Sequence, residues 1–103
     1  MKVVLNRRFG GFSLSPEASK MYNNLKGLKG ENAIDPKYGF LPYIENKIKQ
    51  RSDVILVQVV EKLGRKANGT YSELEIINIP DDAKKPYIDE YDGTETIREG
   101  RSW

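Results

Sequence analysis

The chain of 103 residues contains neither cysteine nor histidine. Without cysteine it has no disulfide framework and no thiol nucleophile, and the usual zinc ligand sets need one of these two residue types. Histidine is also the side chain that most often acts as a general base, so catalysis would have to use carboxylates, lysine, tyrosine or serine. The sequence therefore favours a protein that is not an enzyme and that carries no metal and no cofactor.

Long apolar runs are missing as well. The longest nearly apolar stretch, residues 54–60, is interrupted by Gln58 and is far shorter than the roughly 20 residues that cross a bilayer. At the start of the chain, the apolar residues end at Leu5 and are followed closely by Arg7 and Arg8, which does not fit a signal peptide. We therefore expect a cytoplasmic protein with no membrane partner.

Charge is unevenly divided along the chain. Residues 1–66 carry 13 Lys and Arg against 6 Asp and Glu, whereas residues 67–103 carry 4 against 9. The basic part either forms a binding face for an anion or an acidic partner, or it pairs with the acidic part on folding. Because the net charge is only +2, a nucleic acid is not the expected partner.

The apolar pattern predicts one α+β domain over residues 1–103, since a chain of this length has room for a single core. The predicted architecture is a small, mainly antiparallel sheet of strand 1–6, strand 72–79 and hairpin 87–98, packed on helices 15–26 and 53–63. Ser15 and Pro16 suit the start of the first helix, and Gly27 suits its end. Ser52 is expected to cap the second helix, with Asp53 in its first turn.

Residues 28–50 show no regular periodicity, so we expect a long irregular loop with at most a short helical turn at 43–49. Loops of this length are usually functional or flexible. The aromatic residues in this loop either line a ligand site or pin the loop to the core. Pinning is favoured, because buried aromatic rings contribute large burial energies.

The pair Asp92-Gly93, between two alternating runs, is typical of a two-residue hairpin turn. This register sets Glu90 directly opposite Glu95, where the two carboxylates repel each other unless an arginine, a metal or a raised pKa relieves them. Paired carboxylates are also what acid–base catalysis uses, so a carboxylate enzyme remains an alternative. The arginines considered as partners are Arg7, Arg8 and Arg101.

The segment from Asn6 to Ser15 joins a strand to the N-terminus of a helix. Such a junction offers backbone N–H donors, the positive end of the helix dipole, two guanidinium groups and hydroxyls, which are suitable for holding a phosphate or another anion. The segment lacks the spacing of a P-loop or of a dinucleotide-binding motif. The alternative is a glycine turn that lets the backbone pass the core, with Arg7 and Arg8 solvated or paired to the acidic half.

Five blocks of sequence occur in order, at residues 10–15, 51–64, 76–82, 88–93 and 101–103. Together they resemble a widespread family of small bacteriophage and prophage proteins. The resemblance carries no catalytic motif, and it implies the setting of a phage accessory gene. Small accessory proteins of this kind commonly act by binding a host protein or by sequestering a defence signal, and both roles need complementary shape and charge without turnover.

We therefore expect a non-enzymatic phage accessory protein that counters host defence by sequestering an anionic, nucleotide-like ligand. The first alternative is an inhibitor that binds a host protein through the basic residues 20–51, followed by a nucleic-acid binder and a carboxylate enzyme. A homo-oligomer could build the site. The expected ligand-binding residues, with no catalytic or metal-binding residue among them, are Arg7, Arg8, Gly10, Gly11, Phe12, Ser13, Ser15, Arg51, Glu90, Asp92 and Glu95.

Overall fold

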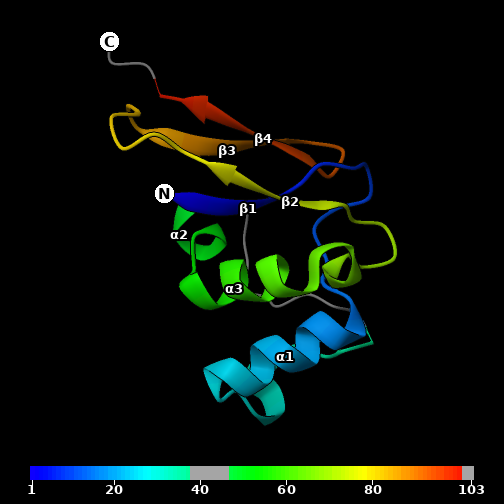
Figure 1. The fold of residues 1–103 in the computed structure, drawn as a ribbon. Coiled ribbons are helices and arrows are strands. Elements are labelled where there is room, and N and C mark those ends of the chain that lie inside the picture. Colours follow the sequence, from blue (N-terminus) through cyan, green and yellow to red (C-terminus); the bar gives the residue numbers. More distant parts are fainter. Residues whose placement is uncertain (38–46, 101–103) are drawn as a thin grey trace.

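The computed structural model of the chain describes residues 1–37 and 47–100 (Figure 1). The strands are β1 (Lys2–Asn6), β2 (Leu74–Asn78), β3 (Pro86–Tyr91) and β4 (Thr94–Glu99). The α-helices are α1 (Pro16–Lys26), α2 (Ile48–Arg51) and α3 (Val54–Leu63), and two short 3-10 helices are η1 (Gly30–Asn32) and η2 (Gly64–Ala67). Among the described helices, none is long and apolar enough to cross a membrane.

The α+β prediction is confirmed, but the strands form two separate two-stranded sheets where one sheet was expected. β1 pairs antiparallel with β2, and β3 pairs antiparallel with β4. β4 contacts β1. In this contact, the backbone N–H of Asn6 at the end of β1 donates to the side-chain carboxylate of Glu95 in β4, at 2.8 Å. This contact is made by a side chain and is not part of a backbone ladder, and the two sheets are separate.

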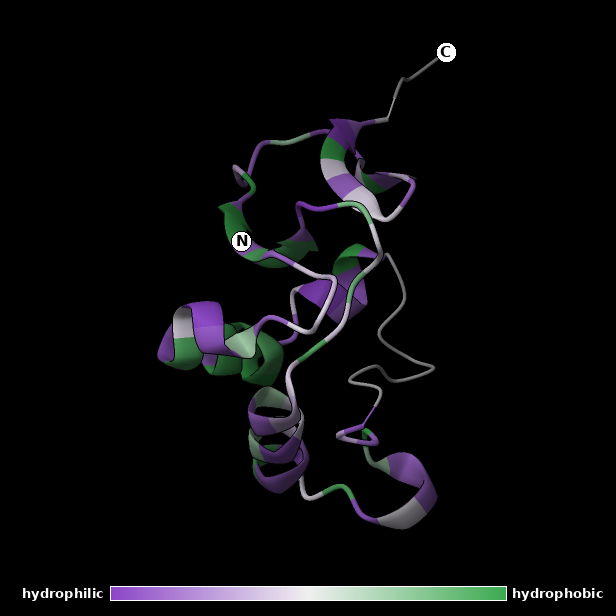
Figure 2. Ribbon diagram, turned by 90° about the vertical axis from the view of Figure 1, so that its right-hand side faces the viewer, coloured by the Kyte–Doolittle hydropathy of each residue, from purple (hydrophilic) through white to green (hydrophobic). Residues whose placement is uncertain are grey.

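The elements are stacked in layers, with the β3–β4 hairpin first, then β1 and β2, then α3 with α2, and α1 last (Figure 1). β1 is buried between two hydrophobic clusters, because successive side chains of a strand point to opposite faces. Val4 packs with Leu56 in the cluster on the helix side, whereas Val3 and Leu5 pack with Ile88 toward the hairpin. Figure 2 accordingly shows hydrophobic residues on β1 and on one side of α3.

The two longer helices lie where the sequence predicts them. The Ser15 hydroxyl accepts a hydrogen bond from the Ala18 N–H at 3.0 Å, and Gly27 ends α1 with a φ of 69°. The predicted cap of α3 is wrong by one residue: Asp53 accepts from the Ile55 N–H at 3.0 Å, while Ser52 ends α2. The reason is that α2 extends to the residue before Ser52 and uses the Ser52 N–H in its own last turn.

The hairpin has the predicted register, with Glu90 opposite Glu95, and its turn has positive φ angles at Asp92 (49°) and Gly93 (91°). These angles are those of the turn type that suits the twist of the flanking strands. A Cβ atom on Gly93 would lie 2.2 Å from the Gly11 nitrogen. Gly93 is therefore required both by the turn and by the close passage of the β1–α1 loop.

The expected irregular loop 28–50 contains η1 and α2 in its described parts. Ile34 is buried in the cluster on the helix side, and the Asn23 side chain binds both its backbone N–H and its carbonyl at 2.8 Å. This part of the loop is thus pinned by an aliphatic side chain and an amide. Most of the expected turn at 43–49, and the loop's aromatic residues, lie outside the described residues.

Tyr22, Lys26 and Asp53 form a polar contact that joins α1 to α3. The Asp53 carboxylate accepts a hydrogen bond from the Tyr22 hydroxyl at 3.0 Å and lies 2.5 Å from the Lys26 ammonium group. Burial alone would raise the pKa of the Asp53 carboxyl, but the hydrogen bonds from Lys26, the Ile55 N–H and Tyr22, with the charge of Lys26, lower it overall. Burial, together with the charge of Asp53 and the hydrogen bond to it, raises the pKa of Tyr22 above its usual range.

The lowered pKa of Asp53 makes the α1–α3 contact sensitive to acid. Because the folded-state pKa lies below the unfolded value of about 4, ionised Asp53 stabilises the fold above that pH, and this stability is lost as the pH falls through the folded pKa. We expect Asp53→Asn, which keeps a good N-cap, to lower the urea midpoint at pH 7 and to differ less from the wild type as the pH is lowered below about 4. Asp82→Asn, in an exposed turn, is the control, and an equally pH-dependent difference for it would contradict this account.

The hairpin turn gives a second prediction. Gly93→Val is expected to destabilise the protein by about 2 kcal/mol or more, because valine is strained at positive φ and its Cβ would meet the backbone of Gly11. Asp92→Asn is expected to change stability by less than about 0.5 kcal/mol, since asparagine tolerates the same φ. Urea denaturation of both variants checks this, and equal midpoints for Gly93→Val and the wild type would contradict it.

Candidate functional site

A buried ion pair between Arg51 and Glu95 lies at the centre of the residues that the sequence singles out. The side chains are 2% and 3% exposed, and both Nη atoms of Arg51 bind the carboxylate, Nη1 on Oε1 and Nη2 on Oε2, the latter at 2.7 Å. Arg51 Nη1 also donates to the Val4 carbonyl at 3.3 Å. The pair thus connects α2 and β4 to β1, and two parallel hydrogen bonds are the strong form of this contact.

Arg51 relieves the expected repulsion between Glu95 and Glu90, and neither Arg7 nor Arg8, two of the arginines expected for this role, binds either carboxylate. Arg7 donates from Nη1 to the Glu95 backbone carbonyl at 3.1 Å, Arg8 lies elsewhere, and Arg101 is outside the described residues. Glu90 is exposed and accepts from the Gly93 N–H at 2.7 Å. The Arg51 partner was not predictable from spacing, because α2 lies far from the hairpin in sequence.

The loop after β1 is fixed to the hairpin turn. The Asn6 side chain donates to the carbonyls of Arg8 and Gly93, both at 2.7 Å, and the Gly10 N–H donates to the Asp92 carbonyl at 3.1 Å. Asn6 is fully buried, so these bonds are shielded from water. The structure therefore brings the predicted loop, Arg51 and the hairpin tip together, and the polar groups of Asn6, Arg51 and Glu95 that meet there are bound within the chain.

The start of α1 is closed in the same way. The Ser15 hydroxyl caps the helix and donates to the Lys66 carbonyl at 2.5 Å, and the Ser15 N–H donates to the Ala67 carbonyl at 2.9 Å. Pro16, the first residue of the helix, has no N–H to offer. The hydroxyl and the N–H of Ser15, two of the donors expected to meet an anion at this junction, thus have partners within the chain.

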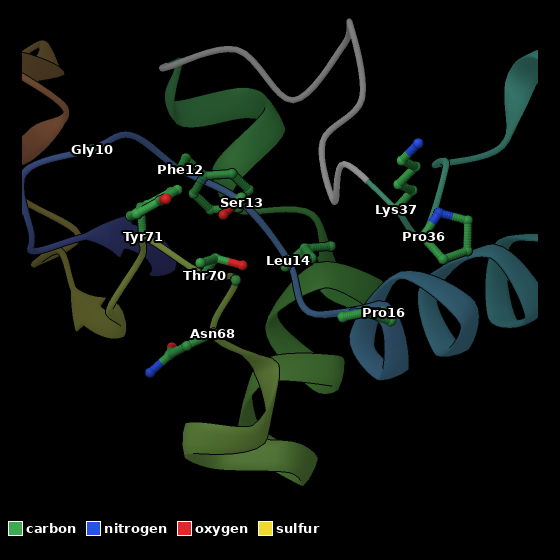
Figure 3. Close-up of a pocket in the computed structure, with 11 residues that line it drawn as sticks. Gly10, Phe12, Ser13, Leu14, Pro16, Pro36, Lys37, Asn68, Thr70 and Tyr71 are labelled. Carbon is green, nitrogen blue, oxygen red and sulfur yellow. The ribbon is translucent and has the colours of Figure 1, made fainter.

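An open cleft of about 500 Å³ lies on the outer side of the same loop (Figure 3). Its walls come from residues 10–16 and from the turn 68–71, with Pro36 and Lys37 at the opposite side from Phe12 and Tyr71. Three predicted ligand-binding residues line it: Gly10, Phe12 and Ser13. The other eight predicted residues do not line this cleft.

Phe12 connects the cleft to the buried ion pair. The guanidinium carbon of Arg51 lies 3.9 Å from the centre of the Phe12 ring, a cation–π contact that fixes the ring. Across the cleft wall, Gly10 passes so close to Tyr71 that a Cβ on Gly10 would lie 2.8 Å from the Tyr71 Cβ. The position of both aromatic side chains therefore depends on how the loop after β1 is held.

Sequence reasoning missed the residues of the 68–71 turn and Lys37. The sequence does not indicate that Thr70 and Tyr71 face the predicted loop. This arrangement arises because the Gly69 N–H donates to the Ser13 carbonyl at 3.2 Å, and the Ser72 hydroxyl donates to the same carbonyl at 2.7 Å.

No protein-family model, curated protein or solved structure matches this chain. Residues 1–37 and 47–100 contain no group of three or more His, Cys, Asp or Glu side chains that could hold a metal ion. The molecule is thus an α+β protein with a ligand-sized cleft, and its phage setting stays a hypothesis.

The buried ion pair gives a stability prediction. Arg51→Met is expected to destabilise the fold by about 3 to 5 kcal/mol, because it leaves the Glu95 carboxylate buried without a counter-charge. Arg98→Met removes the exposed pair with Asp89 and is the matched control, expected to cost less than about 1 kcal/mol. Adding Glu95→Gln to Arg51→Met should recover part of the loss, since it removes the buried charge and keeps an acceptor for Asn6.

Denaturant unfolding of these three variants measures the effect. An Arg51→Met protein that is as stable as Arg98→Met would show that the pair does not hold the layers together.

Proposed function

We propose that this chain is a non-enzymatic binding protein that takes up a small anionic, nucleotide-like ligand in the cleft between residues 10–16 and 68–71. The observation that carries the proposal is the chemistry of the cleft's described lining. It includes two aromatic rings, hydroxyl groups and the Lys37 ammonium group, and it includes no carboxylate. A base can stack on an aromatic ring while the hydroxyl groups donate hydrogen bonds to an anionic group.

The size and polarity of the cleft support this class of ligand. A volume of about 500 Å³ lies within the range of small-molecule sites, which are lined by aromatic and apolar groups with a few polar ones. In the described part of the chain, the hydroxyls of Ser13 and Thr70 have no hydrogen-bond partner, so they are available to a ligand. Because the described lining lacks a carboxylate and the chain lacks histidine, the usual acid–base groups are missing there.

The biological role that we propose is counter-defence in a phage-infected cell, by sequestering the ligand. This part rests on the resemblance of five sequence blocks to small phage accessory proteins. A protein that acts by sequestration needs affinity and abundance but no turnover, which agrees with a cleft built from stacking and hydrogen-bonding groups.

A second candidate function, inhibition of a host protein, is favoured by a different observation. Phe9, Tyr71 and Tyr91 are 64%, 66% and 75% exposed. All three are near Gly10 in the chain or in space. Phe9 precedes Gly10, and Tyr71 packs on it. Tyr91 precedes Asp92, whose carbonyl accepts a hydrogen bond from the Gly10 N–H. Exposed aromatic side chains on neighbouring segments are typical of protein-binding sites.

The test is incubation of the purified protein with an extract of phage-infected cells, followed by mass spectrometry of what it retains. We expect a small phosphorylated molecule, whose affinity falls about tenfold in Tyr71→Ala because a stacking partner is lost. Tyr87→Ala, which removes an exposed tyrosine of β3 away from the cleft, is the matched control and is expected to retain the ligand.

The alternative gives a different pattern. Retention of a host polypeptide without a small molecule, lost in Tyr91→Ala but not in Lys37→Gln, would overturn the ligand-binding proposal in favour of the inhibitor. The choice of Tyr91 separates the two, because this residue does not line the cleft.

A further inference from the structure

A second cavity, of about 590 Å³, lies between η2, the loop after β1 and the start of β2. Its charged lining residues are Arg8, Arg65, Glu73 and Glu75. Only Arg8 among these is a residue that the sequence singles out for ligand binding. Asn68 lines both this cavity and the cleft described above.

The charges of this cavity are not balanced within the chain. The Glu75 carboxylate forms an ion pair with Arg7, with 3.8 Å between Glu75 Oε2 and Arg7 Nε. Within residues 1–37 and 47–100, the guanidinium groups of Arg8 and Arg65 and the carboxylate of Glu73 have no ion-pair or hydrogen-bond partner. Two cationic groups and one anionic group therefore face the same space unpaired, which leaves an excess of positive charge. Guanidinium groups are the side chains best suited to bind oxyanions, by paired N–H···O bonds.

The walls of the cavity are held in place by buried hydrogen bonds. Asn6, which is fully buried, accepts from the Glu73 N–H at 2.9 Å and donates to the Arg8 carbonyl at 2.7 Å, so one side chain fixes two lining residues. Asn68 accepts from the Leu74 N–H at 2.8 Å through its side-chain oxygen. That bond orients the amide, and its NH₂ group remains as a further donor for a ligand.

We infer that this cavity is a second ligand site, which binds an oxyanion group, phosphate or carboxylate, between Arg8 and Arg65. The inference does not depend on the nucleotide-like ligand of the first cleft, because the two sites share only Asn68. Glu73 opposes a simple anion in the cavity, and it favours a ligand that carries a hydrogen-bond donor beside the oxyanion.

The charges in the cavity predict that removing an arginine raises the Kd for phosphate and that removing the charge of Glu73 lowers it. Inorganic phosphate is titrated into the isotope-labelled protein while the amide signals of Gly64 and Asn68 are followed by NMR. We expect saturable shifts, with a Kd that rises about tenfold in Arg8→Gln and in Arg65→Gln, because each variant loses charge-assisted hydrogen bonds. Glu73→Gln is expected to lower the Kd by about two- to fivefold, since it removes the unpaired negative charge.

Lys84→Gln is the control that is matched in charge. Lys84 lies between β2 and β3, whereas the cavity lies at the other end of β2, at Leu74. This variant is therefore expected to bind phosphate like the wild type. A parallel titration with acetate identifies the chemistry of the ligand: the lower of the two Kd values shows whether the site suits a phosphate or a carboxylate.

Shifts that do not saturate, or equal effects of Arg8→Gln, Arg65→Gln and Lys84→Gln, would overturn the inference. The outcome is independent of the first cleft, since Tyr71→Ala leaves both arginines in place. Phosphate binding that persists in Tyr71→Ala but is lost in Arg65→Gln would support the second site even if the nucleotide-like ligand of the first cleft were not found.

Discussion

The arrangement of the layers depends on the buried pair of Arg51 and Glu95. The β3–β4 hairpin has no backbone ladder with β1, so the contact between the two sheets relies on apolar packing and on side-chain hydrogen bonds. Glu95 provides acceptors for both Arg51 and the Asn6 N–H, and Arg51 reaches the Val4 carbonyl. A buried carboxylate needs such partners because desolvation is costly. One ion pair thus joins α2, β1 and β4.

The ion pair and the hairpin turn together hold the loop after β1. Arg51 fixes the Phe12 ring, and the hairpin turn binds the loop at Gly10. The polar groups on the inner side of the loop are therefore used in folding, and Gly10, Phe12 and Ser13 contribute to the cleft on its outer side. Residues that are grouped by one sequence pattern have separate roles, some in holding the loop and some in lining the cleft.

The basic and acidic parts of the chain pair with each other in part. Arg51 binds Glu95 and Arg7 lies beside Glu75, and both contacts join a residue of the first 66 to one of the last 37. Arg8 and Arg65 are not neutralised in this way, and both line the second cavity. Of the two readings of the uneven charge, pairing on folding accounts for the buried contacts, and a basic binding face fits the two unpaired arginines.

The elements that depend on local interactions were predictable from the amino-acid sequence. The Ser15 cap, the glycine at 27 and the turn at Asp92-Gly93 act within a few residues, so α1, most of α3 and the hairpin register were predictable. Three features were visible only in the folded chain: the strands form two sheets, Arg51 is the partner of Glu95, and Tyr71 faces the loop after β1. These features join residues more than 40 positions apart, and such contacts are set by the packing of whole elements, on which periodicity and spacing carry no information.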